Sequence, residues 1–250
     1  MKKTIIEVIS SGGTTLAGIG VGAAFGGPMG AAAGAVLGAS LNPVTTQILS
    51  RVLSSQERTR IEQVADLSKA RFEEEKKKGT PLLKNLNSEN LGQLFEGILL
   101  KAKDSYESKK IPLYANLIAR APFTSTPIAN LNQTLTDLEN LSFRQVCILS
   151  IIDQANFPNT QIVLSQLSYQ QELQNKFSED AQGTYEDILS LIGMGILYQA
   201  EHSSLILIQS ASQIIPSQLG LAYRGTLLCH GASLYLIERT DLQPVIDVLA

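Results

Sequence analysis

A long stretch without charged residues, in which glycine recurs at a strict interval, lies near the N-terminus. From Ile9 to Ser50 there is no Asp, Glu, Lys, Arg or His. Within this stretch six glycines follow one another at every fourth position: Gly18, Gly22, Gly26, Gly30, Gly34 and Gly38. On a helix this spacing places the glycines along one slowly drifting stripe. We call these six residues the glycine zipper.

The zipper is typical of helices whose backbones approach closely. Without side chains along the stripe, two helices can make extensive dispersion contact and weak Cα–H···O bonds. One pair of small residues at this spacing is common by chance, whereas six in register are not. Each glycine costs a helix in water up to about 1 kcal/mol relative to alanine. A helix here therefore needs a partner surface or lipid.

The length of the uncharged stretch leaves two alternatives open. A helix from Ser11 to Leu41 is long enough for a hydrocarbon core, which needs about 20 residues. However, Gly27 and Pro28 interrupt the pattern and predict a kink or a tight hairpin, whose arms are each too short to cross alone. The segment is therefore expected either to insert into or attach to a membrane, or to pack as a hairpin within the protein or an oligomer.

After the zipper, apolar residues at helical spacing predict a series of helices. The first covers residues 44–78, and the next contains the clearest helical period of the chain, over residues 91–106. Further helices are predicted to begin at Pro112, at Pro127, at the capping box of Ser142 and Gln145, at Thr160, and at Thr184, the last ending near Gly193.

Two β-prone pieces follow, residues 195–199 and 204–209, and a helix is predicted from Pro216 through Leu227. Helices followed by a two-stranded wing are the arrangement of a winged helix-turn-helix. The predicted fold is mainly α, with an N-terminal glycine-zipper helix or helical hairpin, a helical middle region and a C-terminal winged-helix-like domain with a small β wing. The predicted domains are residues 1–43, 44–122 and 123–250.

Charge is distributed unevenly along the chain, whose formal net charge is −3. Residues 51–120 carry fourteen Lys and Arg and ten Asp and Glu, whereas residues 121–250 carry four and twelve. The candidate recognition helix, residues 184–193, contains Glu186 and Asp187 and no Lys or Arg. Because DNA-binding winged helices use basic recognition helices, we expect no nucleic-acid partner.

The residues that usually perform catalysis or hold metals are sparse. The chain has two cysteines and two histidines, with no metal-ligand or nucleophile–base spacing: Cys147, Cys229, His202 and His230. The glycines do not match a phosphate-binding loop. We therefore expect no enzyme activity, no catalytic residue, no cofactor and no metal. Two cysteines in apolar surroundings indicate buried reduced thiols in a cytoplasmic protein.

Several short segments resemble bacterial abortive-infection proteins of the Abi-alpha type. The resemblance extends over about half the chain and is carried by residues 110–117, 141–145, 189–197 and 216–220. That family places an apolar, small-residue-rich segment before a winged-helix-like domain. The present chain differs in its glycine zipper and in having little of the usual linker. The resemblance implies a role in antiphage defence, as a toxic membrane effector that stays silent until a partner signals infection.

Two functional hypotheses follow from the sequence. The first is a non-enzymatic membrane-active effector, cytoplasmic at rest, that self-associates through the six zipper glycines and perturbs or permeabilises the inner membrane. Its expected partners are membrane lipid, further copies of itself and a regulatory protein. The second is a helical scaffold or regulator that oligomerises or binds a protein through its N-terminal hairpin, with no lipid involved.

Overall fold

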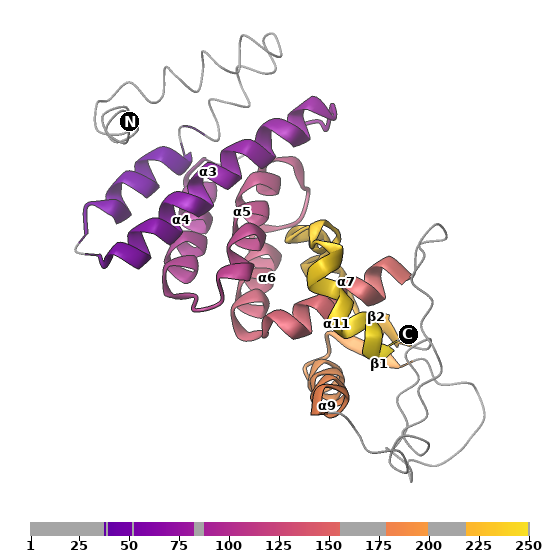
Figure 1. Cartoon of the computed structure of the whole chain (residues 1–250). Helices are drawn as coiled ribbons and strands as arrows, with labels where there is room; N and C mark the ends of the chain where they lie inside the picture. The colour runs from indigo at the N-terminus through magenta and orange to yellow at the C-terminus, as the bar shows by residue number, and fades with distance from the viewer. Residues whose placement is uncertain are drawn as a thin grey trace, which may run out of the picture. The chain divides into compact units, whose positions relative to one another are not determined.

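The computed structural model describes residues 38, 40–51, 53–82, 88–155, 179–199 and 219–249. In these residues the chain is mainly helical, as the sequence predicts, and contains one small antiparallel sheet (Figure 1). The chain divides into two compact units, residues 1–139 and residues 140–250. We describe each unit by itself.

The first unit is a set of helices packed around α3. Residues 40–49 are helical and precede this helix. The elements that follow are α3 (Ser55–Lys77), α4 (Ser88–Asp104), the short 3-10 helix η1 (Ser108–Lys110), α5 (Ile111–Arg120), η2 (Ala121–Phe123) and α6 (Ile128–Asn140). Helix α3 packs against α4 and α5, and these two also pack against each other.

The core of the first unit follows from the helical periodicity of the sequence. Helix α3 buries a single stripe: Ile61, Val64, Ala65, Ser68 and Phe72. The ring of Phe72 meets that of Phe123, with centroids 5.1 Å apart. Helix α4 buries the predicted apolar residues Leu91, Leu94, Phe95, Ile98, Leu99 and Ala102. The helix ends at Asp104, however, and Tyr106, the last residue of the predicted period, is 85% exposed. Pro112 lies in the first turn of α5, where its missing N–H costs nothing.

The prediction of one continuous helix over residues 44–78 is wrong, because the helix is interrupted between Ser50 and Ser54. Ser54 caps α3: its side-chain oxygen accepts the N–H of Glu57, whose carboxylate in turn accepts the N–H of Ser54. This capping box satisfies two backbone donors that a new helix would otherwise leave unpaired. The helix of residues 40–49 and α3 are therefore two separate helices joined by a short turn.

The second unit is organised around α7 (Phe143–Ala155), which is buried along nearly its whole length. Its other elements are α9 (Glu179–Gly193), β1 (Leu197–Gln199), β2 (Leu219–Leu221), α10 (Tyr223–Gly231), η4 (Leu234–Leu236) and α11 (Arg239–Leu249). Helix α7 packs against α9, α10, α11, η4 and β2. It is hydrophobic on all sides because neighbours surround it.

One predicted helix start in the second unit is confirmed and another is wrong. The capping box before α7 forms, because Gln145 N–H bonds Ser142 Oγ at 3.2 Å and Gln145 Oε1 accepts Ser142 N–H at 2.9 Å. Thr184 caps no helix, since α9 already begins at Glu179 and Thr184 is buried within it. The helix ends at Gly193, as predicted.

The sheet corrects the prediction for residues 216–227. Strand β1 pairs with β2 in antiparallel fashion, with Tyr198 opposite Gly220, so Leu219–Leu221 is strand where a helix was expected. The Tyr198 ring covers Gly220 so closely that any side chain there would collide with it. Helix α10 begins only at Tyr223, after Ala222 N–H bonds the Ile196 carbonyl at 3.0 Å. The predicted strand 204–209 and the predicted helix start at Thr160 lie outside the described residues.

We predict that Gly225→Ala destabilises the second unit, because a Cβ at this position in α10 would run directly into the Ile196 carbonyl oxygen. The expected loss in the free energy of unfolding is about 1–3 kcal/mol, the usual cost of overpacking. Gly193→Ala is the matched control, since a Cβ there meets nothing within 4 Å. Urea denaturation of the two variants measures the difference, and equal stability would contradict the close approach.

Candidate functional site

Most of the zipper lies outside the described residues. This holds for Gly18, Gly22, Gly26, Gly30 and Gly34, and for the interruption at Pro28. Gly38, the last zipper glycine, is helical and immediately precedes the helix of residues 40–49. None of the helices in the described ranges is long and apolar enough to cross a membrane. The candidate site is therefore the place where the end of the uncharged stretch meets α3 and α4.

The helix of residues 40–49, which we call the junction helix, buries one face in the first unit. Leu41, Thr45 and Ile48 are buried at the i, i+4, i+7 spacing of a helix, and Leu41 and Ile48 are 0% exposed. Complete burial of such an aliphatic side chain contributes about 1.5–3 kcal/mol. Thr45 Oγ1 donates to the Leu41 carbonyl at 2.9 Å. The polar group at the centre of the buried face is thus satisfied within its own helix.

Two arginines hold the end of the junction helix. Arg58, in the first turns of α3, donates from Nη2 to the Leu49 carbonyl at 3.1 Å. A cation at this position also interacts favourably with the negative end of the helix dipole. Arg51, in the turn, pairs through Nη2 with Glu96 Oε1 of α4 at 3.1 Å. Both contacts are exposed.

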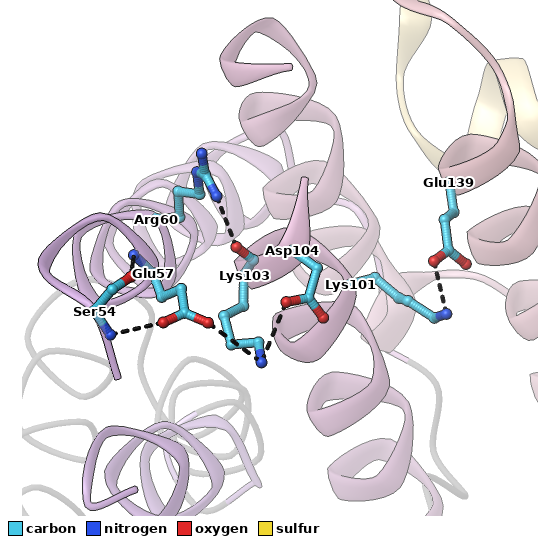
Figure 2. A network of polar contacts seen from close by, with 7 residues as sticks. All are labelled: Ser54, Glu57, Arg60, Lys101, Lys103, Asp104 and Glu139. Atoms are coloured by element: carbon cyan, nitrogen blue, oxygen red, sulfur yellow. Dashed lines mark hydrogen bonds and ion pairs between the residues drawn. The ribbon is translucent and has the colours of Figure 1, made fainter. Parts of the chain in front are cut away.

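The first turns of α3 also connect to the end of α4, as Figure 2 shows. Glu57 Oε1 lies 3.5 Å from Lys103 Nζ, which also pairs with Asp104 Oδ1 at 3.2 Å. Arg60 Nη1 donates to the Lys103 carbonyl at 2.9 Å. Residues 54–60 therefore contact the junction helix on one side and α4 on the other. We call residues 54–60 the α3 hub.

The contacts between the hub and α4 favour the charged forms of Glu57 and Lys103. The pKa of Glu57 is lowered, mainly by the hydrogen bonds from Ser54 and further by the Lys103 charge. The pKa of Lys103 is raised, mainly by its hydrogen bond and attraction to Asp104. A carboxyl whose pKa is lowered by folding stabilises the fold at any pH above its pKa in the unfolded chain. This contribution is lost as pH falls through the pKa of the folded state.

The contacts of the hub were not predicted from the sequence, although part of their signal is local. Ser54 and Glu57 have the S-x-x-E spacing of a capping box, and this pattern was available in the sequence. Arg51 and Glu96 are 45 residues apart, and nothing in the sequence pairs them. Only the folded chain brings this arginine and this glutamate together.

A second polar cluster in the first unit is structural. Lys110 is 3% exposed, pairs with Glu107 Oε2 at 3.3 Å and donates to the Glu139 carbonyl at 3.2 Å. These contacts tie the start of α5 to the end of α6. The pKa of the neighbouring Tyr114 is raised to about 12, mainly by burial, so this phenol stays protonated at physiological pH.

The two cysteines are buried free thiols, as the sequence indicates. Cys147 Sγ donates to the Asp241 carbonyl at 3.7 Å, and Cys229 Sγ donates to the Leu149 carbonyl at 3.8 Å. Burial, together with the Asp153 charge, raises the pKa of Cys229 well above its ordinary value. Because the thiolate is the reactive form, this cysteine is poorly suited to nucleophilic chemistry.

The histidines form no metal centre in the described part of the chain. His230 is exposed in the last turn of α10, as expected, and His202 lies outside the described residues. Within the described ranges no group of three or more His, Cys, Asp or Glu side chains could hold a metal ion. Comparison with protein-family models, with curated proteins and with solved structures gives no significant match.

Asp153, at the end of α7, supports a prediction about pH. Burial raises the pKa of its carboxyl above the ordinary 3.8, with a smaller opposing effect of His230. A raised carboxyl pKa means that the folded protein binds the proton more tightly, so stability falls as pH rises through the folded pKa. Asp153→Asn should therefore stabilise the protein at pH 7, and the gain should shrink as pH falls toward 3.8.

The measurement is urea denaturation of wild type and variant between neutral and acidic pH. Asp247→Asn is the control, because Asp247 is exposed on α11. A gain from Asp153→Asn that does not change with pH would show that the carboxyl is not penalised by burial.

Proposed function

We propose that this protein is a non-enzymatic membrane-active effector that self-associates through the glycine zipper and perturbs or permeabilises the inner membrane. The observation that carries the proposal is the register of Gly18, Gly22, Gly26, Gly30, Gly34 and Gly38 within a stretch that has no charge from Ile9 to Ser50. A stripe of glycines permits close helix–helix contact, which is the means by which helices associate in lipid.

The junction helix supports this proposal because it is the end of the uncharged stretch and its last turn is bound to α3 by the hydrogen bond from Arg58 to the Leu49 carbonyl. Its exposed positions include Pro43, Thr46 and Gln47, which are uncharged. The first charged residue after Glu7 is Arg51, in the turn before α3. A change in the packing of α3 therefore acts directly on the end of the stretch that contains the zipper.

The second unit is proposed to be the winged-helix-like regulatory part. Helix α9 is followed by β1, which pairs with β2, and this order is that of a recognition helix and its wing. Helix α9 carries no Lys or Arg, and its Asp187 pairs with Arg144 of α7. Such a surface suits contact with a protein that signals infection, as the resemblance to abortive-infection proteins implies, better than contact with DNA.

The alternative is a helical scaffold that oligomerises without lipid. One observation favours it: Leu41 and Ile48, at the end of the uncharged stretch, are completely buried in the first unit. If the zipper glycines were buried against protein in the same way, the stretch that contains them would be part of a protein core rather than a membrane segment. The two proposals predict different results for the zipper variants below.

We predict that replacing Gly22, Gly26, Gly30 and Gly34 with leucine leaves the protein at the membrane but abolishes membrane depolarisation when it is overexpressed in a bacterium. Each leucine adds roughly 1.5–3 kcal/mol of apolar burial, which favours partitioning. The branched side chains hold the backbones apart, which weakens association. A voltage-sensitive dye measures depolarisation, and cell fractionation measures location.

The matched control is Ala24→Leu with Ala32→Leu, because residues two positions from a zipper glycine fall on the opposite side of a helix. This control adds apolar area without filling the stripe, so it should depolarise cells as the wild type does. If wild type and control are found only in the soluble fraction and never depolarise cells, the scaffold proposal replaces the effector.

We also predict that the full-length protein gives no gel shift with duplex DNA at physiological salt. Binding to DNA requires Lys or Arg contacts to phosphates, and α9 has none. In the first unit several basic side chains are already paired with carboxylates, among them Arg51, Lys101, Lys103 and Lys110. A shift at micromolar protein that weakens as salt is raised would contradict this prediction.

A further inference from the structure

Resting on the proposed function, we propose that the junction helix is a release device, held in place by two exposed polar contacts: Arg58 to the Leu49 carbonyl, and Arg51 to Glu96. We call these contacts the latch. When they open, the junction helix separates from α3 and α4 and extends the length of chain available to the membrane.

The apolar contacts of the junction helix do not by themselves decide where it lies. Leu41 and Ile48 are fully buried in the first unit, but lipid tails are as apolar as a protein core. Their transfer from core to lipid therefore changes the free energy little. Thr45 keeps its hydrogen bond to the Leu41 carbonyl in either place, because both groups belong to the same helix. The junction helix in the first unit therefore differs from the same helix in lipid mainly in the polar contacts at its end.

The latch contacts are suited to reversible opening. The Arg51 and Glu96 side chains are 45% and 36% exposed, so water can solvate both when they separate. Arg58 likewise donates to a carbonyl at an exposed site. An exposed ion pair is weak and depends on salt, unlike a buried one. After opening, Arg51 directly follows the uncharged stretch that ends at Ser50, a position where an arginine side chain anchors a helix at the headgroup layer.

The test combines Glu96→Gln with Arg58→Met, which reduces the Arg51–Glu96 ion pair to a neutral hydrogen bond, removes the hydrogen bond of Arg58 and nearly keeps the side-chain lengths. The matched control is Glu139→Gln with Lys69→Met, which makes the same charge changes elsewhere in the first unit. Glu139 pairs with Lys101 at 2.7 Å, and these side chains are 37% and 45% exposed, almost as in the latch pair. Lys69 is an exposed residue of α3, the helix that carries Arg58.

The first measurement is hydrogen exchange of the full-length protein, read at residues 45–50 and at α5. The latch variant should exchange about tenfold faster at residues 45–50, the effect of weakening one exposed polar contact and losing the other, with no change in α5. The control should match wild type. Exchange at wild-type rates in the latch variant would overturn the inference.

The second measurement is dye release from vesicles of phosphatidylethanolamine and phosphatidylglycerol. The latch variant should release dye at about tenfold lower protein concentration than wild type, and the control should not. Faster exchange without easier release would overturn the latch and leave the effector proposal standing. If the wild type and the latch variant release no dye at any concentration, the effector proposal itself fails and the latch fails with it.

Discussion

The first unit depends on how the N-terminus of α3 is capped. A helix that begins at Ser55 leaves backbone donors that need partners, and the reciprocal bonds of Ser54 and Glu57 supply them. The same cap fixes the direction of the next residues, so that Arg58 contacts the junction helix and Arg60 contacts the end of α4. The cap therefore sets the position of both neighbours, and the buried stripe from Ile61 to Phe72 starts immediately after it.

Local patterns predicted the helices that bury one face and begin with a cap. The period of residues 91–102 and the capping box at Ser142 needed no information from the rest of the chain, and both appear as expected. The failures have a nonlocal cause. Leu219 stands at helical spacing from Tyr223 and Leu227. Residues 219–221 nevertheless pair with β1, which satisfies their backbone groups and places Gly220 under the Tyr198 ring. No local pattern contains that partner.

The candidate site likewise has one feature that the sequence shows locally and other features that depend on nonlocal contacts. The glycine register is a property of the sequence alone, and it could be recognised without a structure. The contacts that hold the end of the segment could not, because Arg51 and Glu96 are two charges among the 24 Lys, Arg, Asp and Glu residues of positions 51–120. The failure at residues 44–78 is different, since the S-x-x-E pattern at Ser54 was present. The amphipathic pattern of residues 44–78 predicted one helix, although the capping box at Ser54 marks a helix boundary within these residues.

The abrupt step in composition at Arg51 has an energetic consequence. On its N-terminal side the chain has apolar and small residues that protein and lipid solvate almost equally well, whereas on its C-terminal side it has charges that belong in water. In the effector that we propose, a segment with this composition has nearly balanced free energies in protein and in lipid. In such a balance about 1.4 kcal/mol changes the ratio of states tenfold, and exposed ion pairs contribute up to about 1 kcal/mol. Weak contacts at the boundary can therefore control the position of the whole segment, which a strongly hydrophobic helix would not allow.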